Sequence, residues 1–176
     1  MHSIDLSKFN LRTDIALDNF NTNNDNENIK ISKNNNVTIT DVYIDDNSSK
    51  LYNKKVGNYI TLEFDDITDS TNQDNIKSNL YDVLSKLIKV TKDDLVLIVG
   101  LGNRDATSDS LGPKVIDNIV VTNHLYELDV LDDNYYRVSA IEPNVTGITG
   151  IETHTIIKSI VSSIKPKLVI IIDSLE

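Results

Sequence analysis

An uninterrupted apolar run at residues 95–99 is the clearest pattern in the chain, and a polar loop follows it directly. Runs rich in β-branched residues are typical of strands that are buried on both faces of a parallel sheet. A second wholly apolar run covers residues 168–172, and a less uniform one covers residues 136–141. We therefore expect parallel strands at all three places.

Apolar residues at three- and four-residue spacings predict helices around these strands. The first helix starts near Asp74, the second near Leu111, and the third follows the loop at residues 143–150. Because helices and strands that alternate through short connections favour right-handed crossovers, the predicted fold class is α/β, with a mainly parallel sheet flanked by helices. The expected buried positions are Ile76, Leu80, Val83, Leu84, Leu87 and Ile88 in the first helix, Leu111, Val115, Ile116, Ile119 and Val120 in the second, and Ile151, Ile156, Ile157, Ile160, Val161 and Ile164 in the third.

The N-terminal part of the chain shows a different pattern. In residues 37–44 and 59–64, successive side chains alternate between the two faces of a predicted strand, as in half-buried strands. The polar residues 45–50 between these segments are typical of a turn. These segments predict an antiparallel β-hairpin added before the α/β part. Residues 1–20 have too few apolar positions for a core, and residues 21–36 are dense in Asn and Asp, which compete with regular backbone hydrogen bonding.

Residues 1–36 are therefore interpreted as a leader or docking arm followed by a flexible linker, with a plain surface loop as the alternative for the Asn-rich stretch. Residues 37–176 form the predicted α/β domain, because a chain of 176 residues has room for one core of ordinary size.

Composition narrows the classes of partner and chemistry. The chain has 17 Lys and Arg against 27 Asp and Glu, a net charge of -10, which disfavours direct binding of nucleic acid and favours a basic protein partner. It has no cysteine, which excludes a disulfide framework, a thiolate metal site and a cysteine nucleophile. Neither a membrane-spanning run nor a signal peptide is recognisable, so we expect a soluble intracellular protein without membrane contact.

Two aspartates follow the two apolar runs and are the first candidates for chemistry. Asp109 lies in the loop after residues 95–99, and Asp173 directly follows residues 168–172. Parallel strands end at one edge of the sheet, so the two side chains can be neighbours there. A close carboxylate pair retains one proton, which lets one group act as an acid while the other acts as a base towards water. The alternatives are a helix cap for Asp109 and a turn residue for Asp173.

Glycines mark two loops at the same predicted edge. The first loop is not a dinucleotide fingerprint, because Asp105 stands at the position of the third glycine, and it lacks the lysine of a phosphate-binding loop. Glycines let the backbone approach a ligand or a neighbouring segment, and loop amides can stabilise an oxyanion or receive a capping oxygen. The candidate residues are Gly100, Gly102 and Asn103 in the first loop and Gly147 and Gly150 in the second.

The histidines do not predict a metal site. His2, His124 and His154 lie in separate segments without ligand spacing. A site assembled across the sheet edge from Asp109, Asp173 and His154 is the alternative, and no metal is expected.

Three segments of the chain resemble the germination protease family of spore-forming bacteria, in the same order and with similar spacing. They are GLGNRDATSDSLGP at residues 100–113, PNVTGITGIET at residues 143–153 and LVIIIDSL at residues 168–175. DLSKFNLRTDIAL at residues 5–17 and VGNYITLEF at residues 56–64 also resemble that family. The resemblance therefore extends over essentially the whole chain.

The resemblance implies an endopeptidase that degrades small acid-soluble, DNA-protecting spore proteins during germination. It implies a zymogen that removes its own leader, a homotetramer, a location in the cytoplasm of the forespore and spore core, and no cofactor. By position, Asp109 and Asp173 match the two functional aspartates of the family, which is assigned to the aspartic type. Residues 13–16 resemble the site cut in the substrates, so self-cleavage is expected next to Asp14, before Ile15.

Two features of the resemblance leave alternatives open. The family is structurally close to the hydrogenase maturation peptidases, with a phosphorylase/hydrolase-like fold, and those relatives use nickel. A nickel-dependent maturation-type peptidase is therefore the second hypothesis, and a non-catalytic module that binds a small ligand is the third. Family members also continue beyond the IIIDSL motif, whereas this chain ends at Glu176, so a domain truncated at its C-terminus is expected.

Overall fold

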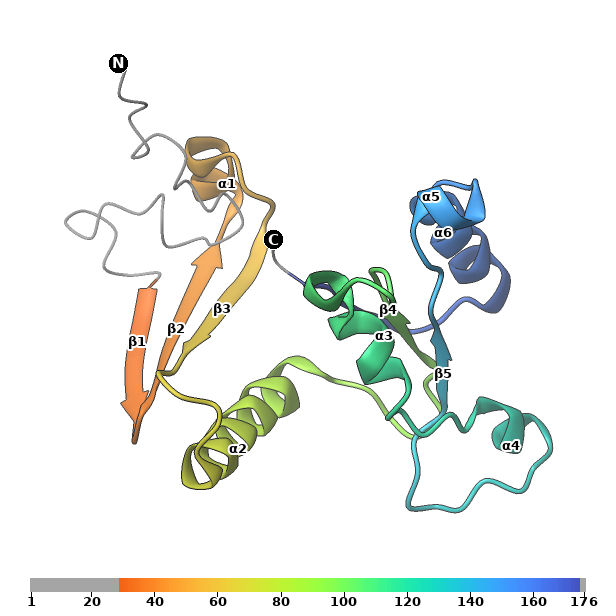
Figure 1. Cartoon of the computed structure of the whole chain (residues 1–176), viewed down its shortest axis with the longest axis horizontal. Helices are drawn as coiled ribbons and strands as arrows, with labels where there is room; N and C mark the ends of the chain where they lie inside the picture. The colour runs from red at the N-terminus through yellow and green to blue at the C-terminus, as the bar shows by residue number, and fades with distance from the viewer. Residues whose placement is uncertain (1–28, 175–176) are drawn as a thin grey trace. The chain divides into compact units, whose positions relative to one another are not determined.

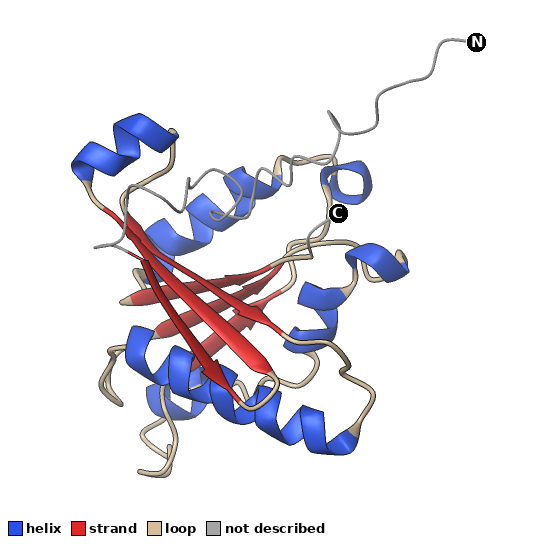
Figure 2. Ribbon diagram, turned by 90° about the vertical axis from the view of Figure 1, so that its left-hand side faces the viewer, coloured by secondary structure: helices blue, strands red, loops and turns tan. Residues whose placement is uncertain are grey.

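The computed structural model describes residues 29–174, which form parts of two compact units, Met1–Ile88 and Lys89–Glu176. The predicted leader and the cleavage position next to Asp14 lie outside the described residues. The boundary between the units lies within the stretch that the sequence assigns to one domain. Figure 1 labels the helices α1–α6 and the strands β1–β5, and Figure 2 colours the helices and strands by type.

The first unit contains a three-stranded antiparallel sheet in the order β1-β2-β3. The predicted hairpin is confirmed: β2 (Val37–Ile44) pairs with β3 (Gly57–Glu63) in antiparallel register. The expected turn between them is wrong, because a short helix, α1 (Asp46–Tyr52), occupies this connection. The carboxylate of Asp45 caps this helix by accepting hydrogen bonds from the amides of Asn47 and Ser48.

The linker interpretation fails for its last part, where β1 (Ile29–Asn34) pairs along its full length with β2. The Asn residues that suggested disorder at this hairpin dock it onto the helix α2. The Nδ2 of Asn34 donates to Oδ1 of Asn79 at 3.0 Å, and that of Asn35 donates to Oδ1 of Asn75 at 3.1 Å. Asn35 has φ 53°, a left-handed turn conformation that Asn tolerates well.

Helix α2 (Ser70–Leu87) begins four residues before the predicted start, because Asp69 accepts a hydrogen bond from the Thr71 amide and so caps it there. Of its predicted apolar face, Ile76 and Val83 are buried, together with Asn79 between them. Three other predicted core positions, Leu80, Leu84 and Leu87, remain exposed.

The second unit contains a three-stranded parallel sheet in the order β5-β4-β6, which confirms the predicted parallel strands. The strands are β4 (Val96–Gly100), β5 (Val138–Ile141) and β6 (Leu168–Ile172). The core of this unit is centred on β4 and comprises Leu95, Val96, Leu97 and Val99.

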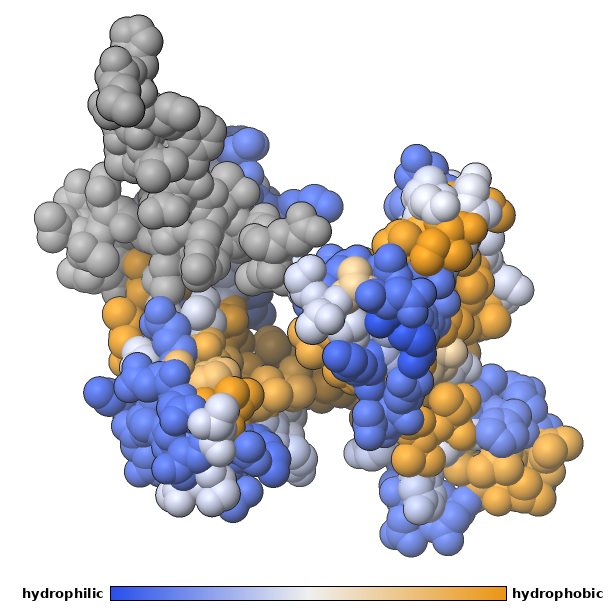
Figure 3. All heavy atoms as spheres, viewed as in Figure 1, coloured by the Kyte–Doolittle hydropathy of each residue, from blue (hydrophilic) through white to orange (hydrophobic). Residues whose placement is uncertain are grey.

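Four α-helices accompany this sheet within the described residues: α3 (Leu111–Ile116), α4 (Asn123–Glu127), α5 (Thr146–Thr149) and α6 (Thr153–Ile164). Helix α3 is shorter than predicted, and its expected core residues Leu111 and Val120 are exposed. The Nδ2 of Asn118 donates to the carbonyl of Lys114 at 2.8 Å, which competes with the next helical hydrogen bond. Exposed apolar side chains also lie on or beside α4 and α5 (Figure 3): Leu128, Val130, Ile148 and Ile151.

Among residues 29–174, none of the helices is both long enough and apolar enough to span a bilayer.

We predict that Asn79→Ala lowers the free energy of unfolding by about 1–3 kcal/mol, because Asn79 is buried, the Asn34 side-chain amide loses its acceptor and the Asn75 carbonyl loses its donor. Asn75→Ala is the matched control, with the same gain in helix propensity one turn away. It removes only an exposed contact, so its effect should stay within about 0.5 kcal/mol. Urea unfolding measures both, and equal losses would contradict the docking role of Asn79.

Candidate active site

The backbone at the ends of β4 and β6 lies in close contact with the backbone at the start of α3. A Cβ atom on Gly100 would lie 2.4 Å from the carbonyl oxygen of Gly112. One on Gly112 would lie 2.2 Å from the carbonyl oxygen of Leu101 and 2.7 Å from that of Ile172. The Leu101 amide donates to the Ile172 carbonyl at 2.8 Å and extends the ladder past the strand ends. Only glycine, which has no Cβ atom, therefore fits at positions 100 and 112.

Asp109 lies in the loop that joins β4 to α3, at the end of the short 3₁₀ helix η3 (Thr107–Asp109). The Asn103 amide donates to both the main-chain oxygen and Oδ2 of Asp109, each at 2.9 Å. Gly102 has φ +115°, and a Cβ there would lie 2.0 Å from the Asp109 carbonyl oxygen. The capping alternative for Asp109 is not observed: Ser110 holds the cap position of α3, and the carboxylate binds back onto its own loop.

Asp173 directly follows β6, and the register pairs its neighbour Ile172 with Gly100 at the end of β4. The structure thus places Asp109 and Asp173 after adjacent parallel strands, at the same edge of the sheet. Asp173 is exposed and Asp109 is half-buried, and Oδ1 of Asp173 accepts a hydrogen bond from the Ser174 amide at 2.9 Å. Water can therefore reach the Asp173 carboxylate at this edge.

The second glycine loop carries α5, and it differs from the first. Gly150 has φ +69° and ends α5 in the left-handed conformation, whereas a Cβ on either Gly147 or Gly150 would meet no atom within 4 Å. These glycines leave open space above the backbone. In both loops amides are engaged: those of Leu101 and Asn103 donate to Ile172 and Asp109, and that of Gly150 donates to the Thr146 carbonyl at 2.8 Å.

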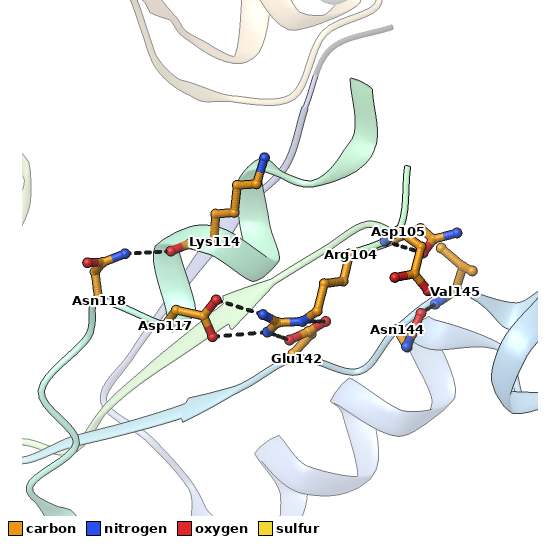
Figure 4. A network of polar contacts seen from close by, with 9 residues as sticks. Arg104, Asp105, Lys114, Asp117, Asn118, Glu142, Asn144 and Val145 are labelled. Atoms are coloured by element: carbon orange, nitrogen blue, oxygen red, sulfur yellow. Dashed lines mark hydrogen bonds and ion pairs between the residues drawn. The ribbon is translucent and has the colours of Figure 1, made fainter. Parts of the chain in front are cut away.

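An ion-pair network that sequence spacing did not reveal lies beside the first loop (Figure 4). Arg104 donates through Nη1 and Nη2 to the two carboxylate oxygens of Asp117, at 2.6 and 3.1 Å. Its Nη2 and Nε also donate to Glu142, the latter at 3.3 Å. These hydrogen bonds from Arg104 hold the pKa of the Asp117 carboxyl below its usual range, and the two carboxylates raise the pKa of Arg104.

The histidines of the described chain do not join this site as ligands. His124 lies on α4 and His154 on α6, and both are exposed. Across residues 29–174, no cluster of three or more His, Asp or Glu side chains has the arrangement to hold a metal ion.

We predict that Gly112→Ala destabilises the protein by about 1–3 kcal/mol or more, because the added methyl group overlaps the Leu101 and Ile172 carbonyls. Gly147→Ala is the matched control in another short helix. Its methyl group enters open space, so helix propensity should make the change neutral or stabilising by up to about 1 kcal/mol. Thermal or urea unfolding distinguishes the two, and similar losses would show that packing is not the cause.

Substitution of Arg104 by Met should raise the pKa of Asp117 towards the ordinary value of about 3.9, since the donors that favour the carboxylate are removed. Because the folded-state pKa is lowered, the stabilisation by this pair is present above the unfolded-state pKa and is lost as the pH falls through the folded-state value. Carboxyl carbon shifts followed by NMR through this pH range measure the change. An unaltered Asp117 titration would contradict the assigned cause.

Comparison with known proteins gives one consistent result. A model of the germination protease family matches residues 8–176. A germination protease of Bacillus cytotoxicus is 40% identical over 188 residues, which cover 98% of this chain and 51% of that protein. One from Bacillus cereus is 37% identical with the same coverage. The chain therefore spans about half the length of these curated relatives. Because the family match extends along nearly the whole sequence, this chain belongs to the germination protease family.

Proposed function

We propose that this chain is part of an endopeptidase that degrades small acid-soluble spore proteins during germination. The observation that carries the proposal is the position of Asp109 and Asp173 after adjacent parallel strands in a chain of the germination protease family. The names of the relatives support the peptidase class, and the position of two aspartates after adjacent parallel strands supports a mechanism that uses a carboxylate pair.

The proposed mechanism is water activation of the aspartic type. One carboxylate takes a proton from water as the water oxygen attacks the peptide carbonyl carbon. The other group, protonated at the start, gives its proton to the peptide nitrogen, so collapse of the tetrahedral intermediate re-forms the carbonyl, breaks the C–N bond and releases the nitrogen as an amine. The bifurcated hydrogen bond from the Asn103 amide supports an orienting role at Asp109, because its bond to Oδ2 restrains the rotation of that carboxylate.

Amides of the loops at Gly100, Gly102 and Asn103 or at Gly147 and Gly150 are proposed to stabilise the oxyanion. Amides are already used in both loops: those of Leu101 and Asn103 donate to Ile172 and Asp109, and that of Gly150 donates to the Thr146 carbonyl at 2.8 Å. Open space above Gly147, near the start of α5, favours its amide within the second loop.

The wider assignment follows the same family membership. We propose a fold related to the hydrogenase maturation peptidases, a zymogen that removes its own leader, a homotetramer, and a location in the cytoplasm of the forespore and spore core. The substrate partners are small acid-soluble spore proteins. Neither direct nucleic-acid binding nor membrane binding forms part of the proposal, and no cofactor is required.

Substitution of Asp109 or Asp173 by Asn in the complete protein should reduce kcat for a spore-protein substrate by about 10²–10⁴-fold, because general acid–base catalysis contributes a factor of this size. Asp105→Asn is the matched control: it lies in the same loop and is exposed, and it should retain activity. Turnover retained in both Asp109 and Asp173 variants would refute the dyad. Inhibition by a chelator, with nickel in the purified protein, would instead support the metal-dependent alternative.

The complete protein should cleave its own leader next to Asp14, before Ile15, under maturation conditions. Mass spectrometry of the N-terminus detects this bond cleavage. An intact N-terminus in an otherwise active enzyme would refute self-processing, and saturable ligand binding without any proteolysis would favour the non-catalytic alternative.

A further inference from the structure

Arg104 directly follows Asn103, the residue whose amide holds Asp109. Its guanidinium lies between two carboxylates from different elements: Asp117 at the end of α3 and Glu142 after β5. Four hydrogen bonds link these three side chains, and they use Nε, Nη1 and Nη2. The planar fork of Arg suits such an arrangement, because it can bind carboxylates through parallel hydrogen bonds in a defined orientation.

The network is more constrained than an ordinary surface ion pair. The Glu142 side chain is 17% exposed, and those of Arg104 and Asp117 are 46% and 51% exposed. The pair Lys77–Asp74 provides a comparison, with exposures of 72% and 84% and a single 3.7 Å contact. Single exposed pairs contribute little, whereas a multidentate network restrains the position of the backbone that carries it.

That backbone leads directly to Asp109. The Gly102–Asn103 peptide presents its N–H to the Asp109 carbonyl and Oδ2, and Gly102 is in contact with the same residue. Arg104 is the next residue along the chain, so its side chain limits how far this peptide can rotate or withdraw. Loss of the network would remove one restraint on this peptide, whose Asn103 carbonyl also accepts a hydrogen bond from the Ala106 amide at 3.1 Å.

We propose that Arg104 is a positioning residue: by bridging Asp117 and Glu142, it holds the Asn103 amide on Asp109 and so maintains the orientation of that carboxylate for peptide hydrolysis. This inference rests on the proposed function. Arg104 does not act on the substrate in this arrangement, because its donors face the carboxylates of Asp117 and Glu142. Its effect on the reaction passes through Asn103.

The decisive variants are Arg104→Met and Arg104→Lys, made in the complete protein. Arg104→Met should reduce kcat by about 10²-fold with KM within about threefold, since a small displacement of a reacting group has an effect of this order. Arg104→Lys should restore part of kcat, because it keeps the charge without the fork. Lys114→Met is the matched control: it removes a positive charge from an exposed position on α3 outside the network and should retain wild-type kcat.

The network itself is tested by removing the carboxylates. Asp117→Asn and Glu142→Gln should each reduce kcat less than Arg104→Met. Combined with Arg104→Met, neither should reduce kcat further, because residues of one network act together. Additive losses would overturn the bridging role. A raised KM with unchanged kcat in Arg104→Met would also overturn it and would indicate substrate contact.

A second measurement does not depend on activity. Hydrogen exchange of the Asn103 amide should be at least tenfold faster in Arg104→Met than in wild type and Lys114→Met. Unchanged exchange overturns the positioning role even if kcat falls. A complete wild-type protein that cleaves no spore protein overturns the proposed function, and the exchange rates then still decide whether Arg104 holds the loop.

Discussion

Contact between backbones at Gly100 and Gly112 is the constraint on which the candidate site depends. The space there admits hydrogen but no methyl group, so α3 starts directly against the ends of β4 and β6. The connecting loop has to turn back within this narrow region, and Gly102 and the Asn103 amide close it onto Asp109. Rigid strand ends thus determine where a carboxylate on a loop can lie.

Electrostatics sets a second requirement in a chain with a net charge of -10. Asp109 and Asp173 follow adjacent strands at one edge of the sheet, and Asp117 and Glu142 bind Arg104 of the loop that carries Asp109. Arg104 offsets the nearest structural carboxylates, Asp117 and Glu142, and leaves the two candidate catalytic groups outside the ion-pair network. Asp117 and Glu142 are therefore engaged by one guanidinium, whereas the carboxylates of Asp109 and Asp173 are not part of that network.

Hydrophobic pattern was sufficient to predict the elements that carry a core. Residues 168–172 coincide with β6, and residues 95–99 are shifted by one position from β4. The shared edge of Asp109 and Asp173 followed because parallel strands end on the same side. The strand β1 was missed because its side chains are mostly exposed, so no alternation of buried positions marks it, and its conformation depends on pairing with β2 across the two-residue turn at residues 35–36.

The Arg104 network was missed for a related reason. Its partners lie 13 and 38 residues away in the sequence, and no spacing rule connects them. The early start of α2 and the presence of α1 each depend on one capping carboxylate, that of Asp69 and that of Asp45. Asp is common both at helix caps and in turns. Local propensity could not distinguish a cap from a turn at these positions.

The Asn103–Asp109 contact joins residues only six positions apart, and it has a consequence for how the site assembles during synthesis. Both residues of this contact are present as soon as one short segment has left the ribosome, whereas Glu142 of the Arg104 network follows later. Asp173 arrives only with β6, the last strand of the described chain, and it reaches the edge only after β6 has paired with β4. Chain order alone would keep a partly synthesised protein from bringing both aspartates together.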